Sequence, residues 1–165
     1  NCRSSKRISP KQLIMIEDSQ SKMQILLCDD DEDDRMFFSD AIIELKMQHM
    51  LTVFETGIEL MHYLHHPDTF LPHILFLDIN MPCKSGLECL REIREHAKFK
   101  DLVVAIYSTS NTPDDIEETF TNGANIYIKK PADFEKLKKT IHHILNLNWQ
   151  YHTAGLNKET FFLSI

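Results

Sequence analysis

The stretch Ile74-Leu75-Phe76-Leu77-Asp78-Ile79-Asn80-Met81-Pro82 lies near the middle of the chain and decides the predicted fold. Its first four residues are apolar without any polar–apolar alternation. Short runs of this kind are typical of strands that are buried on both faces of a parallel sheet. Asp78 follows the run directly, so we expect a carboxylate at the carboxyl end of a buried strand.

Segments of the same kind lie on both sides of this run. Strand-like stretches alternate with stretches whose apolar residues recur at helical spacing. The alternation predicts an α/β fold with a doubly wound parallel sheet and helices on both faces. The expected strands are residues 24–28, 51–54, 74–77, 102–107 and 126–128, and the expected helices are residues 33–47, 85–95, one opening at Thr56, one opening at Thr112 and one carrying Phe134 to Leu145.

Local signals support the helix positions. Thr56 and Glu59 have the spacing of a capping box, in which the first side chain bonds the backbone of the second. Thr112 is followed by Pro113, a pair typical of a helix start. Gly123 suits the end of that helix, because glycine tolerates a left-handed backbone.

The composition excludes several classes of protein. The chain has 165 residues, 42% of them hydrophobic and 26% charged, which is typical of one soluble domain. A net charge of −7 argues against a nucleic-acid partner. No apolar run reaches the roughly 20 residues that span a bilayer, and the polar start is unlike a signal peptide, so we expect a cytoplasmic protein without a membrane partner. Cys2, Cys28, Cys83 and Cys89 have no metal-type spacing and are expected to be reduced.

We expect three parts along the chain. Residues 1–22 are a polar tail, for which disorder, a tag remnant and an over-extended start are all open explanations. Residues 23–147 form the folded domain. Residues 148–165 are an extension that either packs on the domain or is flexible, and they are too few for a separate output domain.

Polar residues follow four of the expected strands. They are Asp29 and Asp30, Asp78, Ser108, and Lys129 with Lys130. Parallel strands end at one edge of a sheet, where α/β folds bind their ligands. Carboxylates packed this closely repel one another unless a cation neutralises them, and Mg²⁺ prefers oxygen ligands.

This pattern predicts a magnesium-dependent phosphoryl acceptor. Asp30, Asp78 and the backbone carbonyl of Asn80 would bind Mg²⁺ directly, and Asp29 would bind through water. Carboxylates accept phosphoryl groups as aspartyl phosphates, which makes Asp78 the expected acceptor. Lys130 and Ser108 would then hold two of the phosphoryl oxygens.

Five stretches of the chain form a recognisable set. They are Ile25-Leu26-Leu27-Cys28-Asp29-Asp30, Leu77-Asp78-Ile79-Asn80-Met81-Pro82 with Gly86, Tyr107-Ser108-Thr109-Ser110, Gly123-Ala124, and Tyr127-Ile128-Lys129-Lys130-Pro131. In this order they resemble the receiver domain of two-component response regulators, of the stand-alone kind found in chemotaxis regulators. The resemblance covers about residues 24–147 and implies a flavodoxin-like sheet of five strands in the order 2-1-3-4-5, bound Mg²⁺, and phosphorylation by a sensor histidine kinase or a histidine phosphotransfer protein.

The resemblance also assigns roles to single residues. Asp78 matches the phosphoacceptor, and the pair Asp29 and Asp30 matches the acidic metal-binding pair. Lys130 matches the family's lysine because it directly precedes Pro131. Ser108 and Tyr127 match the hydroxyl and aromatic residues of the switch that alters a surface for an unknown downstream protein; phosphorylation-dependent homodimerisation is left open. Thr109 departs from the small residue that is usual in the family and would narrow access to Asp78.

Two other functions make different demands on the sequence. A receiver-like module that binds partners without phosphorylation predicts substitutions in the acidic pair, at Asp78 or at Lys130, and the sequence has none. A phosphohydrolase with an aspartyl-phosphate intermediate usually has a second aspartate two residues after the nucleophile, where this chain has Asn80. The chain is therefore not expected to be an enzyme beyond phosphorylating and dephosphorylating itself.

Some polar and apolar residues are given ordinary structural roles. Asp31, Glu32 and Asp34 are expected to serve the start of a helix and its dipole. An EF-hand is excluded because the required glycine and final glutamate are missing. Histidines at 62, 65, 66, 142 and 143 are expected to be exposed or half-buried, and methionines at 36, 47, 50 and 61 are expected to lie in the core.

Overall fold

The computed structural model describes residues 22–147 and 158–163. The prediction of a polar N-terminal tail falls almost entirely outside this range, as do Cys2 and residues 148–157 of the predicted C-terminal extension. Within the described residues, no helix has the length and apolar character needed to span a membrane.

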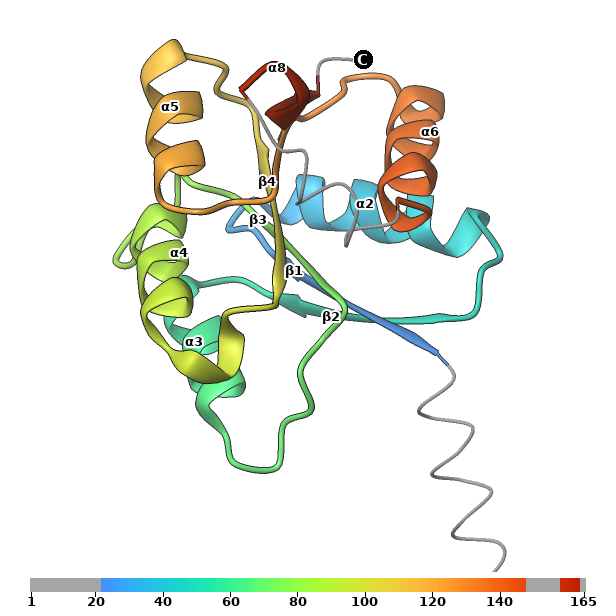
Figure 1. Cartoon of the computed structure of the whole chain (residues 1–165). Helices are drawn as coiled ribbons and strands as arrows, with labels where there is room; N and C mark the ends of the chain where they lie inside the picture. Colours follow the sequence, from blue (N-terminus) through green and yellow to red (C-terminus); the bar gives the residue numbers. More distant parts are fainter. Residues whose placement is uncertain (1–21, 148–157, 164–165) are drawn as a thin grey trace, which may run out of the picture.

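The centre of the fold is a parallel sheet (Figure 1). Its strands lie in the order β2-β1-β3-β4-β5-β6, and all neighbouring strands are parallel. The bounds are β1 (Met23–Cys28), β2 (His49–Phe54), β3 (Ile74–Leu77), β4 (Val103–Ser108), β5 (Ile126–Lys129) and β6 (Phe162–Leu163).

The first five strands confirm the flavodoxin-like order 2-1-3-4-5, and β6 corrects the number of strands to six. This sixth strand has two residues, too few for any periodic pattern in the sequence. It forms because the outer edge of β5 offers unpaired backbone groups to a neighbouring segment.

Helices cover both faces of the sheet (Figure 1). Helices α2 (Glu32–Glu44) and α6 (Phe134–Leu145) lie on one face, and α3 (Gly57–His65), α4 (Gly86–Glu95) and α5 (Pro113–Thr121) lie on the other. The short helices are η1 (Ala97–Phe99) and α8 (Lys158–Phe161). Each face has its own core cluster, because successive residues of a strand point to opposite faces.

The helix starts agree with the capping signals in part. Thr112 accepts a hydrogen bond from the backbone of Asp115, and Pro113 opens α5. Thr56 accepts from Glu59 N, but the Glu59 carboxylate accepts from Glu55 N, so only half of the predicted capping box forms.

Two glycines are required by the backbone around them. A Cβ on Gly86 would lie 2.0 Å from the carbonyl oxygen of Asp78, so the start of α4 packs directly on the end of β3. Gly123 has φ +86° just after α5, which confirms its predicted place at the end of that helix.

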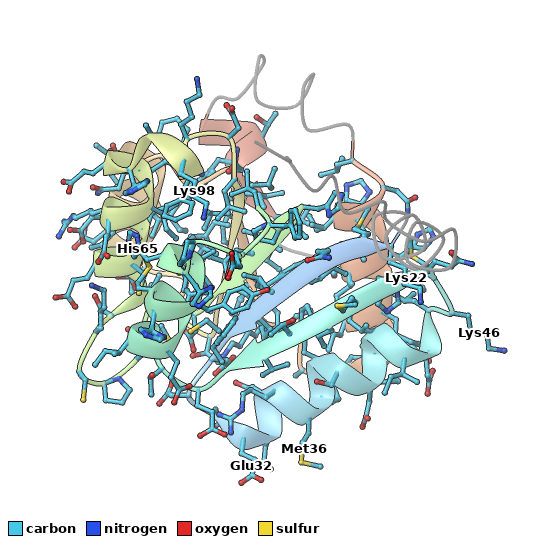
Figure 2. All side chains as sticks on the ribbon, turned by 90° about the horizontal axis from the view of Figure 1, so that it is seen from below. Lys22, Glu32, Met36, Lys46, His65 and Lys98 are labelled. Carbon is cyan, nitrogen blue, oxygen red and sulfur yellow. The ribbon has the colours of Figure 1, made fainter. Side chains whose placement is uncertain are left out.

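The prediction that Met36 and Met50 lie in the core is wrong. Met36 is 59% exposed and Met50 is 45% exposed, and Figure 2 shows Met36 pointing away from α2. The buried face of α2 is instead formed by Phe38, Ala41 and Ile42. The five histidines at 62, 65, 66, 142 and 143 are exposed, as predicted.

Candidate functional site

Backbone hydrogen bonds align the strand ends that carry the candidate site. Asp29 N donates to Phe54 O over 3.1 Å, and Asp78 N donates to Cys28 O over 3.0 Å. Lys130 N donates to Ser108 O over 2.8 Å. Because these bonds continue the parallel pairing beyond the strands, side chains that are far apart in sequence are brought to one edge of the sheet.

Three carboxylates gather at this edge. One oxygen from each of Asp29, Asp30 and Asp78 lies within 4.8 Å of the others. Asp29 is fully buried and Asp78 is 6% exposed, whereas Asp30 faces solvent. The predicted acidic cluster therefore forms with one open side.

The ammonium of Lys130 neutralises part of this charge. Its Nζ lies 2.7 Å from Asp29 Oδ2, 2.8 Å from Asp34 Oδ2 and 2.9 Å from Asp78 Oδ2. The Lys130 side chain is only 6% exposed. Burial by itself would lower the pKa of Lys130, but its contacts with the three carboxylates outweigh burial and raise the pKa, so the ammonium stays charged.

Asp29 lacks a full set of partners. Burial raises the pKa of Asp29 to about 6, although contact with Lys130 opposes the rise. The 2.7 Å contact between Asp29 Oδ2 and Lys130 Nζ is an ion pair. No donor within the described residues is aligned with this oxygen as a hydrogen bond, so it keeps a buried lone pair. A hard cation beside Asp30 and Asp78 would satisfy that oxygen through one of its bound waters.

Two residues of the site were missed by the sequence reasoning. Asp34 was expected only to serve the helix dipole, but its carboxylate accepts a hydrogen bond from Lys130. Arg35 donates to the carbonyl oxygens of Asp29 and Asp30 over 3.0 and 2.9 Å and holds the turn that carries the acidic pair. The signal in the sequence was that both residues are charged and lie only a few positions after the acidic pair. Asp31 is the N-cap of α2, as predicted.

A polar chain extends from Asp78 toward β5. Asn80 N donates to Asp78 Oδ1 over 3.1 Å, and Asn80 Nδ2 lies 3.5 Å from Ser108 Oγ. Ser108 is fully buried and accepts from Ser110 N over 3.3 Å. The hydroxyl of Tyr127 donates to Ser110 O over 3.0 Å. The sequence-predicted switch residues, Ser108 and Tyr127, are therefore linked to Asp78 through neighbouring contacts.

Most of this fold, including the site, matches one known family. Residues 25–142 match the response regulator receiver domain. The chain belongs to this family. Receiver domains are phosphoacceptor modules of two-component systems rather than enzymes of the ordinary kind, and they work with histidine kinases or phosphotransfer proteins.

Two relatives are identical to this chain at about a quarter of the aligned positions. The response regulator Rcp1 of Synechocystis sp. is 26% identical over 134 residues, which cover 79% of this chain and 91% of Rcp1. The chemotaxis protein CheY1 of Helicobacter pylori is 27% identical over 127 residues, which cover 76% of this chain and 99% of CheY1.

Solved structures agree on the fold. The phosphorylated cyanobacterial phytochrome response regulator RcpA has a TM-score of 0.69 at 29% identity, covering 74% of this chain and 91% of RcpA. The Mn²⁺-bound form of Rcp1 has a TM-score of 0.67 at 26% identity, covering 74% of this chain and 91% of Rcp1.

Proposed function

We propose that this receiver domain accepts a phosphoryl group on Asp78 in a Mg²⁺-dependent reaction in the cytoplasm. The donor would be a sensor histidine kinase or a histidine phosphotransfer protein, and the modified domain would present a changed surface to a downstream protein. One observation carries the proposal: the Asp78 carboxylate has an oxygen within 4.8 Å of oxygens of Asp29 and Asp30 and lies 2.9 Å from the ammonium of Lys130.

The carboxylates fit a hard divalent cation. Asp29 Oδ2 is buried with the Lys130 ammonium 2.7 Å away but with no aligned hydrogen-bond donor among the described residues, and Asp30 leaves one side of the cluster open to solvent. Asp30, Asp78 and the carbonyl of Asn80 would be the ligands, with Asp29 acting through water. When bound, Mg²⁺ supplies positive charge to the oxygens of the transferring phosphoryl group. The Mn²⁺-bound form of the relative Rcp1 supports this assignment.

The residues around Asp78 suit phosphoryl transfer. An oxygen of Asp78 attacks the phosphorus, the bond from phosphorus to the donor nitrogen breaks, and the donor imidazole keeps the electron pair. Lys130 stays protonated because its carboxylate partners raise its pKa, so it can hold a phosphoryl oxygen. The Ser108 hydroxyl donates to another oxygen. Hydrolysis of the acyl phosphate returns the domain to its resting state.

The switch would use the polar chain from Asp78 to Tyr127. Movement of the Ser108 hydroxyl toward the phosphoryl group changes the space beside Tyr127, which is fully buried. Tyr127 lies on β5, so a change there alters the surface around this strand. Whether phosphorylation also joins two copies of the chain stays a prediction.

Turnover of external phosphoesters is not part of the proposal. The position two residues after Asp78 holds Asn80, which donates a hydrogen bond toward Ser108 and whose amide is far too weak an acid to protonate a leaving group. Steady hydrolysis of p-nitrophenyl phosphate that disappears in Asp78→Asn would overturn this conclusion.

Intact-mass measurement tests the proposed reaction. The full chain is incubated with acetyl phosphate, with Mg²⁺ or with a chelator. We expect a mass gain of one phosphoryl group only when Mg²⁺ is present, and none in Asp78→Asn. Asp33→Asn is the matched control, because Asp33 is exposed in the first turn of α2, outside the cluster. An unmodified wild-type chain would refute the proposal.

A further inference from the structure

The described C-terminal residues cover the outer edge of the sheet. We call residues 158–163 the terminal segment; it consists of α8 and β6. Strand β6 pairs in parallel with β5, with Phe162 opposite Tyr127 and Leu163 opposite Ile128. Figure 1 shows α8 at the end of the molecule where α5 lies. The terminal segment thus occupies the edge of β5 that the first five strands leave open.

Aromatic side chains anchor the terminal segment on Tyr127. Phe161 is fully buried, and its ring centroid lies 5.1 Å from that of Phe120 on α5 and 6.3 Å from that of Tyr127. The Phe162 ring lies 5.8 Å from Tyr127. Because one of its six residues is a fully buried phenylalanine, this segment has a defined docking position on the domain.

Tyr127 therefore touches both the terminal segment and the polar chain of the phosphorylation site. Its ring packs on Phe161 and Phe162, and its hydroxyl donates to Ser110 O. From Ser110 the contacts continue through Ser108 and Asn80 to Asp78. These residues form a continuous physical path from the phosphoacceptor to the terminal segment.

We infer that the terminal segment is a built-in ligand of the surface around Tyr127 on β5, and that its docking on Tyr127 and occupancy of the Asp78 site favour each other. The inference rests on the proposed function, because it assumes that Asp78 binds a phosphoryl group. Phe161 packs on Tyr127 in its buried position. Movement of the Ser108 hydroxyl toward Asp78 leaves room for the Tyr127 ring in that position. Coupling between two sites is reciprocal, so each event strengthens the other. A partner of the phosphorylated form would meet a surface that includes α8 and β6.

Affinity for fluoroberyllate, a phosphoryl mimic, tests the coupling in the full chain. Titration calorimetry with Mg²⁺ present compares the wild type with Phe161→Ala. We expect the variant to bind at least about fivefold more weakly, which is the lower end of usual coupling between sites. Phe161→Leu, which keeps an apolar side chain, should fall between the two. Phe70→Ala is the matched control, because Phe70 is 75% exposed in the loop between α3 and β3, and it should bind as the wild type does.

Hydrogen exchange gives a second test that does not depend on a variant. Fluoroberyllate should slow amide exchange in β6 of the wild type. Equal affinities in the wild type and Phe161→Ala, tighter binding by the variant, or unchanged β6 exchange would each overturn the inference while leaving the proposed function intact. A wild type that does not bind fluoroberyllate would instead refute the proposed function, and the inference with it.

Discussion

Replacement of Lys130 by methionine removes the positive charge of the site and keeps the apolar length of the side chain. In the wild type, Lys130 Nζ lies within 2.9 Å of carboxylate oxygens of Asp29, Asp34 and Asp78. The side chains of Asp29 and Asp78 are 0% and 8% exposed, so without the ammonium they become buried like charges with no cation. We expect a folded but less stable protein that no longer accepts a phosphoryl group.

The cost can be bounded. Removing one partner of a buried ion pair destabilises proteins by about 3–5 kcal/mol. The lower end applies here, because Asp34 is 34% exposed and its share is screened by solvent. Proton uptake also limits the loss. Each unit by which the pKa of Asp29 rises costs about 1.4 kcal/mol, but once that pKa exceeds the pH of the solution the carboxyl takes up a proton and the cost stops growing. We therefore expect Lys130→Met to lower the free energy of unfolding by about 3 kcal/mol at neutral pH without Mg²⁺.

Urea unfolding of the wild type, Lys130→Met and Lys129→Met measures this cost. Lys129 is the neighbouring residue and is exposed, so its replacement should change the free energy of unfolding by less than about 0.5 kcal/mol. Saturating Mg²⁺ should narrow the gap between Lys130→Met and the wild type, because the cation replaces the lost charge and binding stabilises the folded state. Equal losses at the two lysines, or a gap that Mg²⁺ leaves unchanged, would refute the electrostatic account of the site.

Three further outcomes follow from the geometry. Gly86→Ala should cost at least about 2 kcal/mol in urea unfolding, because its Cβ would lie 2.0 Å from the carbonyl of Asp78; wild-type stability would contradict the close approach. The affinity for Mg²⁺ should fall about tenfold from pH 7 to pH 5, because burial raises the pKa of Asp29 to about 6 and a proton then competes with the cation. Amide chemical shifts measure this affinity, and an affinity that does not change with pH would contradict a role of Asp29 in cation binding. Asp34→Asn should lower the free energy of unfolding by no more than about 1 kcal/mol, and Asp33→Asn should not change it. Equal free energies of unfolding for the two variants in urea would show that the contact from Asp34 to the Lys130 ammonium does not stabilise the fold.

The sheet and most helices were predictable because their signals are local or periodic. Buried parallel strands such as β3 are short apolar runs, and helices such as α5 carry their own start signals. The meeting of Asp29, Asp78 and Lys130 was also predictable, because parallel strands bring their carboxyl ends to one edge.

The rest depends on contacts that no local pattern encodes. Asp34 reaches Lys130 only because the first turn of α2 lies over the strand ends, and the same acidic residue would be an ordinary helix-start residue elsewhere. Strand β6 exists because Phe162 and Leu163 find an open edge on β5, which is a property of the assembled sheet. Met36 fits a helical period but faces away from the core, because hydrophobic type alone does not fix which face is buried.

Reductive trapping of the acyl phosphate would test the central claim most directly. After incubation with acetyl phosphate and Mg²⁺, borohydride converts a phosphorylated aspartate to homoserine, and peptide sequencing locates the changed residue. We expect homoserine at position 78 alone. Homoserine at position 29, 30 or 34, or no conversion anywhere in the chain, would contradict it.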